Sequence, residues 1–158
     1  MIVANHSRIA LACPAKVNLV LSVGSMTAAS SLHPIVSWMV AVTLFDDLAL
    51  ERADDQTSFD IAFHHDAPVS SRVDWTPEED LAHRAHLLLE SHVGRPLPVQ
   101  VTLRKRIPTG SGLGGGSSNA AGALIGLNHL LGLGLDGAVL EKLASKLGSD
   151  VPFLLCDV

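Results

Sequence analysis

The sequence predicts one folded domain, with strands mostly in its first half and helices in its second half. Strand-like alternation of apolar and polar residues recurs in residues 17–23, 58–63 and 97–103. Helical spacing of apolar residues recurs in residues 77–93, 117–131 and 136–147. With 158 residues, 47% of them hydrophobic, the chain is long enough to bury a substantial core.

The first strands flank a proline. Residues 8–13 form a short apolar run, and residues 17–23 alternate in the manner of a half-buried strand. Pro14 lies between them and, because it lacks a backbone N–H, marks a strand start, an edge or a break. Residues 35–50 are largely apolar and predict one or two further strands.

The helix over residues 77–93 has clear start and stop signals. Thr76 can cap it, Pro77 suits the first helical position, and Glu79 completes a capping box. Gly94 ends the pattern. A second helix is expected from Ser117 to Leu131.

Two elements are expected near the end of the chain. Asp136 can cap a helix that runs to Leu147, and Gly148 ends it. The short apolar run at residues 151–156 predicts a strand.

Composition excludes several classes of protein. The formal net charge of −5 disfavours sequence-independent binding to nucleic acid, which needs clustered Lys and Arg. No apolar run approaches the roughly 20 residues that span a bilayer, so no membrane partner is expected. Two cysteines, Cys13 and Cys156, are too few for a disulfide scaffold and predict reduced core thiols in a cytoplasmic protein.

A glycine-rich segment between a predicted strand and a predicted helix is the most distinctive feature. Five glycines lie within seven residues, at positions 110, 112, 114, 115 and 116. Such a loop lets backbone N–H groups converge on an anion, and the helix N-terminus adds a partial positive charge. Ser117 and Ser118 add hydroxyl groups there. We therefore expect phosphate binding.

Three common phosphate motifs do not fit this loop. A Walker A loop would need a lysine where Gly116-Ser117-Ser118 stands. Gly110-x-Gly112-x-x-Gly115 satisfies the dinucleotide pattern, but no strand precedes Asp136, the acidic residue at the required spacing. The glycine loop of protein kinases leads into a strand, whereas this one leads into a helix.

A fourth pattern fits. Residues 108–121, Pro-Thr-Gly-Ser-Gly-Leu-Gly-Gly-Gly-Ser-Ser-Asn-Ala-Ala, closely resemble the phosphate loop of the GHMP small-molecule kinases. Residues 14–19, Pro-Ala-Lys-Val-Asn-Leu, and residues 148–153, Gly-Ser-Asp-Val-Pro-Phe, resemble two further motifs of that family in the right order.

The resemblance implies an α+β fold of the ribosomal-protein-S5-domain-2-like type, with a mixed or antiparallel sheet backed by helices. It makes residues 1–158 the N-terminal, ATP-binding domain of such a kinase, and the C-terminal GHMP domain is absent from this chain.

The resemblance also implies roles for individual residues. The loop would bind the phosphates of ATP through Pro108, Gly110, Ser111, Gly112, Leu113, Gly114, Gly115, Gly116, Ser117 and Ser118. Ser117 or Ser118 would lie near Mg²⁺. Asp150 would act as the catalytic base, and Lys16 would keep it ionised and offset charge at the attacking oxygen.

Asn18 and His33 match family positions that contact the small-molecule substrate. The triple glycine is most similar to the branch that phosphorylates the 2-hydroxyl of a cytidyl-linked methylerythritol in non-mevalonate isoprenoid biosynthesis. Leu32 stands where that branch has an aromatic residue over the base, and Asp80 stands where it has an asparagine near the nucleotide.

Two alternatives stay open. One is a GHMP kinase for another alcohol, of the homoserine or mevalonate type, which Leu32 favours. The other is a catalytically inactive nucleotide-binding remnant, which the missing C-terminal region favours. A homodimer is compatible with the sequence.

Overall fold

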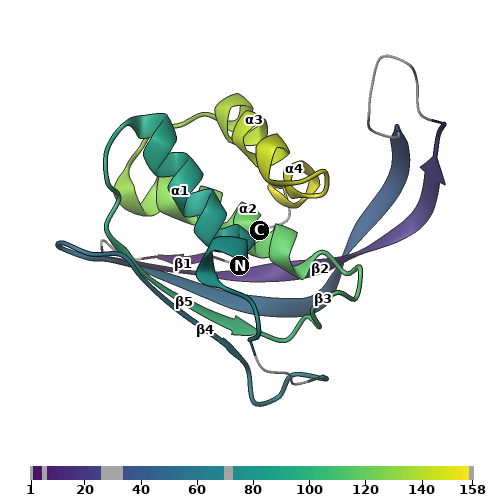
Figure 1. Cartoon of the computed structure of the whole chain (residues 1–158), viewed down its shortest axis with the longest axis horizontal. Coiled ribbons are helices and arrows are strands. Elements are labelled where there is room, and N and C mark those ends of the chain that lie inside the picture. The colour runs from purple at the N-terminus through teal and green to yellow at the C-terminus, as the bar shows by residue number, and fades with distance from the viewer. Residues whose placement is uncertain (1, 5–6, 26–33, 70–72, 157–158) are drawn as a thin grey trace.

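The computed structural model describes residues 2–4, 7–25, 34–69 and 73–156, and within these ranges five strands form one sheet in the order β1-β2-β3-β5-β4 (Figure 1). The strands are β1 (Ile2–Ala4), β2 (Arg8–Val23), β3 (Ile35–Arg52), β4 (Ser58–Phe63) and β5 (Val99–Lys105). Neighbouring strands are antiparallel, except that β4 and β5 are parallel. The sheet is therefore mixed.

The helices lie together over one face of the sheet (Figure 1). They are the short 3₁₀ helix η1 (Pro77–Glu79) and the α-helices α1 (Leu81–Val93), α2 (Gly115–Leu131), α3 (Gly137–Leu147) and α4 (Val151–Leu154). α2 packs directly on β2 and β3, and α1, α3 and α4 each contact α2. The predicted α+β fold, a sheet backed by helices, is confirmed. In the part of the chain that is described, no helix has the length and apolar character needed to cross a membrane.

The hydrophobic core lies between the sheet and the helices. β5 shows how the sequence pattern builds it, because Val99, Val101 and Leu103 are buried while Gln100 between them is exposed. The helices contribute mostly small and branched apolar side chains, namely Ala82, Ala85, Leu89, Ala120, Ala121, Leu124 and Leu127. The alternation predicted for this strand therefore marks its two faces correctly.

The two cysteines differ in their surroundings. Cys13 is fully buried on β2, and burial, followed by the nearby Asp46 carboxylate, raises the pKa of its thiol to about 12. Cys156 is a free and exposed cysteine. The expectation of a core thiol is therefore correct for Cys13 and wrong for Cys156.

The segments on either side of Pro14 form one strand rather than two. β2 continues through Pro14 because the register against β3 shifts between Pro14 and Ala15, and such an irregularity tolerates a residue without a backbone N–H. Residues 35–52 likewise form the single long strand β3.

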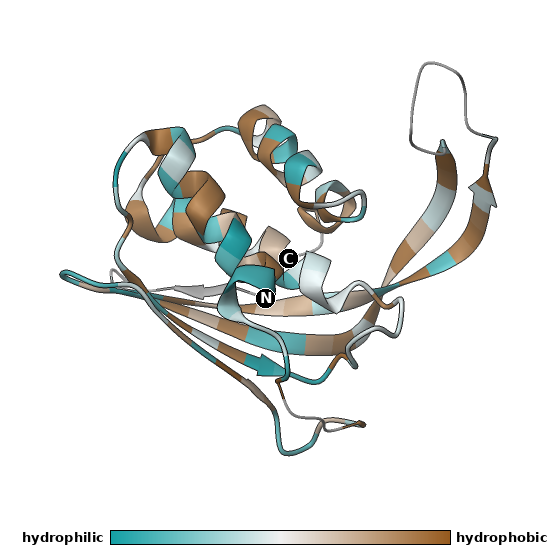
Figure 2. Ribbon diagram, viewed as in Figure 1, coloured by the Kyte–Doolittle hydropathy of each residue, from teal (hydrophilic) through white to brown (hydrophobic). Residues whose placement is uncertain are grey.

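The distal parts of β2 and β3, residues 17–23 and 35–40, extend as a two-stranded arm beyond the helices (Figures 1 and 2). Sequence alternation predicts that residues 17–23 are half-buried, but this is wrong. No described helix covers the arm in Figure 1, and its large apolar side chains are exposed: Leu19, Val20, Leu21, Val23, Ile35, Val36 and Trp38.

The helix predicted over residues 77–93 is interrupted. The backbone N–H of Thr76 donates to Glu79 Oε2 at 2.8 Å, as a capping box requires, but this box closes only the 3₁₀ turn η1. The chain becomes extended at Asp80, whose carboxylate accepts from the backbone N–H of Ala82 and begins α1. Gly94 ends α1 in the left-handed conformation, as predicted.

Two other elements test the expectations for the second half. The side chain of Asp136 caps α3 by accepting from the backbone N–H of Val139 at 2.9 Å, which confirms that helix. The strand expected at residues 151–156 is wrong, because residues 151–154 form the helix α4. Val151 and Leu154 are both buried, which is the helical i, i+3 spacing, and proline is well tolerated in the first helical turn.

α2 approaches the sheet closely at Gly126. A Cβ atom there would lie 2.5 Å from Leu50 Cδ1 and 2.9 Å from Leu11 Cδ1. Both leucines are buried in the core, so neither can move away freely.

We expect the substitution Gly126→Ala to lower the free energy of unfolding by about 1–3 kcal/mol, because the added methyl group overpacks the core. The measurement is urea unfolding followed by circular dichroism. Gly137→Ala is the matched control, since nothing lies within 4 Å of its Cβ position in the first turn of α3. Equal effects of the two substitutions would contradict the close packing of α2.

Candidate functional site

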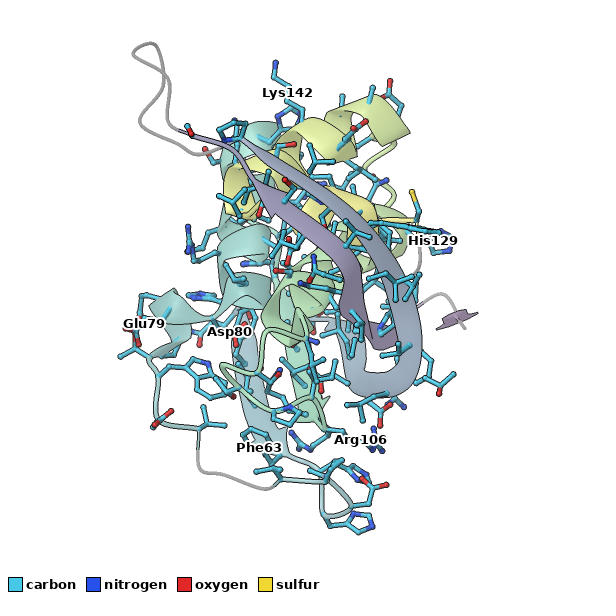
Figure 3. All side chains as sticks on the ribbon, turned by 90° about the vertical axis from the view of Figure 1, so that its right-hand side faces the viewer. Phe63, Glu79, Asp80, Arg106, His129 and Lys142 are labelled. Carbon is cyan, nitrogen blue, oxygen red and sulfur yellow. The ribbon has the colours of Figure 1, made fainter. Side chains whose placement is uncertain are left out.

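The glycine loop, residues 106–114, connects β5 to α2 and forms one wall of a cleft of about 590 Å³. The opposite wall comes from the segment around η1, including Trp75, Asp80 and Leu81. Figure 3 shows Glu79 and Asp80 on this η1 side and Arg106 below them, near the base of the loop. We call this space the loop cleft. The N-terminus of α2 lines this loop cleft.

The structure places nearly all of the predicted phosphate-binding residues on the loop cleft. Its lining includes Pro108, Gly110, Ser111, Gly112, Leu113, Gly114, Gly115, Gly116 and Ser117. Ser118 is the exception, because it is fully buried and does not line the cleft. The Ser118 Oγ atom has no hydrogen-bond partner among the described residues.

Close packing within the protein requires glycine at two positions of this segment. Gly114, which directly precedes α2, has a φ of 72°, and a Cβ atom there would lie 2.9 Å from Lys16 Cγ. At Gly115 a Cβ atom would lie 2.8 Å from Ile107 Cγ2. The loop therefore folds back tightly on β2 and on its own first residues, which presents the first turn of α2 to the cleft.

A buried carboxylate holds the start of the loop. Asp46, on β3, is fully buried, and its Oδ1 atom accepts from the backbone N–H groups of Arg106 at 2.6 Å and Ile107 at 2.8 Å. Its Oδ2 atom accepts from Lys105 Nζ at 2.7 Å. Lys105 also donates to Asn119 Oδ1, on α2, at 2.8 Å. One carboxylate thus joins β3, β5, the loop and α2.

Sequence reasoning missed this cluster. A signal was present, because Asp46 interrupts the apolar residues of 35–50, and a carboxylate inside a buried strand needs a partner. The partner could not be inferred, since Lys105 lies far away in sequence.

Lys16 and Asp150 come together on the other side of the loop. Lys16 Nζ lies 3.1 Å from Asp150 Oδ2, and the Lys16 side chain is almost completely buried. Asp150 directly precedes α4 and is partly exposed. The backbone N–H of Lys16 donates to the carbonyl oxygen of Leu113 at 2.9 Å, which ties β2 to the loop. Leu113 and Gly114 therefore lie against the loop cleft and are also tied to the ion pair.

The predicted substrate residues have different outcomes. Asn18 lies two residues beyond Lys16 on β2, and its Oδ1 atom accepts from Lys16 Nζ at 2.6 Å. His33 and Leu32 lie outside the described residues.

Asp80 and Trp75 form the wall opposite the loop. The Asp80 carboxylate accepts from the backbone of α1 and, through Oδ2, from the Trp75 indole N–H at 3.1 Å. An asparagine would cap the helix about as well, so the acidic residue keeps the capping role of the residue it replaces. Trp75 was not selected from the sequence, and it adds a flat aromatic surface to the cleft.

No metal centre is built from protein side chains alone in residues 2–4, 7–25, 34–69 and 73–156, where no three His, Cys, Asp or Glu side chains are grouped suitably.

We expect the substitution Asp46→Asn to lower the free energy of unfolding by about 3 kcal/mol, because it leaves the buried Lys105 ammonium without a counterion. Asp47→Asn is the matched control. Asp47 pairs with Arg106 in an exposed position, so its loss should change stability by less than about 1 kcal/mol. Chemical denaturation measures both, and similar effects would contradict the anchoring role of Asp46.

Comparison with known proteins gives a consistent result. Residues 80–157 match the family described as GHMP kinases N terminal domain. The chain is 43% identical over 143 residues to a 4-diphosphocytidyl-2-C-methyl-D-erythritol kinase of Symbiobacterium thermophilum, covering 90% of this chain and 48% of that protein. It is 39% identical over 142 residues to the kinase of the same name from Mycolicibacterium smegmatis, covering 90% and 42%.

Solved structures show the same relationship. A crystal structure of 4-(cytidine 5'-diphospho)-2C-methyl-D-erythritol kinase matches with a TM-score of 0.70 and 36% identity, covering 94% of this chain and 49% of that one. Homoserine kinase from Cytophaga hutchinsonii shares the fold, with a TM-score of 0.63 at 19% identity, covering 96% of this chain and 43% of that one. The chain spans about half the length of the relatives it matches. The chain is thus similar to GHMP kinases over nearly its whole length, and residues 80–157 match the N-terminal domain of that family.

Proposed function

We propose that the protein carrying this chain uses ATP to phosphorylate the 2-hydroxyl of 4-diphosphocytidyl-2-C-methyl-D-erythritol, a step of non-mevalonate isoprenoid biosynthesis. Residues 1–158 form its N-terminal, ATP-binding domain, and its C-terminal GHMP domain lies outside this chain. Support comes from relatives of that name at about 40% identity. One observation carries the proposal. The backbone N–H of Lys16 donates a hydrogen bond to the carbonyl oxygen of Leu113, which puts the Lys16–Asp150 pair next to the glycine loop.

The loop cleft fits the phosphate chain of a nucleotide. The first turn of α2 begins at Gly115, and backbone N–H groups at a helix N-terminus favour anions. The loop packs closely on β2 and on its own first residues, since a side chain at Gly114 or Gly115 would collide with Lys16 or Ile107. Ser117 lines the cleft at the start of α2 and would hold Mg²⁺. When bound, ATP supplies the transferred phosphoryl group and Mg²⁺ neutralises its developing charge.

Ser118 has a different relation to this site. Its hydroxyl is buried and unpartnered among the described residues, so it would reach the cation only if the first turn of α2 adjusted. We therefore favour Ser117 as the cation ligand.

Asp150 and Lys16 would act on the hydroxyl group. Asp150 lies partly exposed directly before α4, where its Oδ1 atom, which the Ser149 hydroxyl contacts at 3.4 Å, can accept the proton of the attacking hydroxyl. Lys16 forms an ion pair with this carboxylate and would stabilise negative charge on the attacking oxygen. Phosphoryl transfer needs little more than this positioning and charge stabilisation.

We propose that Asn18 and His33 contact the small-molecule substrate, as the family resemblance implies. Asn18 adjoins Lys16 on β2. We place the activity in the cytoplasm, where free thiols such as Cys13 and Cys156 stay reduced. A homodimer stays a prediction.

The substitution of Leu32 for the aromatic residue of the family keeps a second substrate class in view. A leucine gives up base stacking worth roughly 1–3 kcal/mol. Assays of the complete gene product should therefore compare the cytidyl substrate with homoserine and mevalonate. Turnover of either alternative alone would overturn the substrate assignment, and no turnover of any would identify an inactive remnant.

We expect Asp150→Asn to lower kcat of the complete gene product by about 100-fold or more, the usual contribution of a general base, while nucleotide affinity changes little. Phosphoryl transfer is followed by release of ADP. Asp136→Asn is the matched control, because asparagine caps a helix as well as aspartate and α3 should be preserved. Full turnover in the Asp150 variant would refute its assignment as the base.

Trp75 offers a direct test of the nucleotide site. The chain has two tryptophans, Trp38 on the arm and Trp75 on the loop cleft. We expect Mg-ATP to quench fluorescence in the Trp38→Phe variant, because a purine ring entering the cleft stacks near Trp75. The reciprocal variant, Trp75→Phe, should show little change. The opposite pattern would place the nucleotide elsewhere.

A further inference from the structure

A chain of side-chain contacts leads away from the Lys16–Asp150 pair along the arm. Lys16 Nζ, which lies 3.1 Å from Asp150 Oδ2, also donates to Asn18 Oδ1 at 2.6 Å. The Asn18 Nδ2 group donates to Ser37 Oγ, on β3, at 2.6 Å. The Ser37 hydroxyl in turn donates to the carbonyl oxygen of Val20 at 3.0 Å. The chain thus ends on the backbone of β2.

The chemistry of the donors and acceptors allows these hydrogen bonds to be donated in one direction only, from Lys16 to Asn18, from Asn18 to Ser37 and from Ser37 to Val20. An ammonium group has no acceptor, so Lys16 requires the oxygen of the Asn18 amide rather than its nitrogen. Asn18 must then turn its NH₂ group toward Ser37, which has to accept. Because the single hydroxyl proton of Ser37 is directed to the Val20 carbonyl, a lone pair is left for Asn18. Ser37 therefore holds the amide in the orientation in which its oxygen faces Lys16.

Ser37 also lies beside an irregularity in the β2–β3 ladder. The register shifts between Asn18 and Val20, so Leu19 is an extra residue on β2. Such bulges re-aim side chains next to functional sites. Ser37 pairs with Leu21 in register and reaches back to the carbonyl of Val20. It thereby secures the bulge that sets the direction of Asn18.

We propose that Ser37 is a positioning residue of the phosphoryl-transfer site. Through Asn18 it holds the Lys16 ammonium against Asp150, although it touches neither of these groups itself. This inference rests on the proposed function, since it assigns to Lys16 and Asp150 the roles given above.

A purely structural role predicts a different outcome from a positioning role. Ser37 lies on the arm, whose large apolar neighbours such as Val36 and Trp38 are exposed and which extends past the helices. Removing one hydroxyl there should leave the unfolding midpoint nearly unchanged. A loss of turnover would then arise in the site and not from unfolding.

The decisive comparison is between two substitutions of the same shape. Thr at position 37 keeps the hydroxyl, whereas Val replaces it with a methyl group, and both suit a strand. In the complete gene product we expect Ser37→Val to lower kcat about tenfold, the loss that follows from one hydrogen bond, with KM for ATP unchanged. Ser37→Thr should keep most of the activity. Ser22→Ala is the control, because Ser22 is on the same arm, paired with Val36, but outside this chain of contacts.

A second readout does not depend on turnover. In ¹⁵N-labelled protein, the side-chain amide resonances of Asn18 should shift in Ser37→Val and stay near their original positions in Ser37→Thr and Ser22→Ala. Normal kcat in Ser37→Val, or equal losses in the Val and Thr variants, would overturn the role of Ser37. Absence of phosphoryl transfer in the unaltered protein would instead overturn the proposed function, and an unshifted Asn18 resonance would overturn the contact itself.

Discussion

The buried carboxylate of Asp46 is the interaction on which the functional geometry depends. It binds two backbone N–H groups at the start of the glycine loop and the ammonium of Lys105, which also holds Asn119 on α2. A buried charge is costly unless it is fully partnered, and Asp46 has three donors. The loop therefore leaves β5 in a defined direction, and α2 begins at a defined place.

The loop that Asp46 anchors has the loop cleft on one side and the Lys16–Asp150 ion pair on the other. On one side, the loop and the first turn of α2 line a cleft suited to phosphate. On the other, the buried Lys16 and the partly exposed Asp150 form an ion pair, and the backbone N–H of Lys16 is hydrogen-bonded to the carbonyl oxygen of Leu113 in the loop. A movement of Leu113 or Gly114 would disturb both sides. A side chain at Gly114 would cause such a movement, because its Cβ atom would lie 2.9 Å from Lys16 Cγ.

Local signals in the sequence were enough to locate the loop, the cap at Asp136 and the end of α1 at Gly94, because each depends on residues only a few positions apart. They failed where tertiary packing decides. Pro14 lies within a strand because a register shift accommodates it, and the apolar run after Asp150 forms a helix because Val151 and Leu154 pack on the same side. The Asp46–Lys105 pair joins different strands, so no local pattern could reveal it. The Lys16–Asp150 contact was expected only through family resemblance.

The placement of Lys16 and Asp150 has a consequence for how the protein is made. One residue lies on the first long strand and the other at the start of the last described helix, so their contact closes almost the entire chain into a loop. During synthesis the glycine loop and α2 emerge well before Asp150. On a ribosome-bound chain the loop cleft can therefore form before Asp150 has emerged, and the ion pair with Lys16 closes only when the last described helix is made.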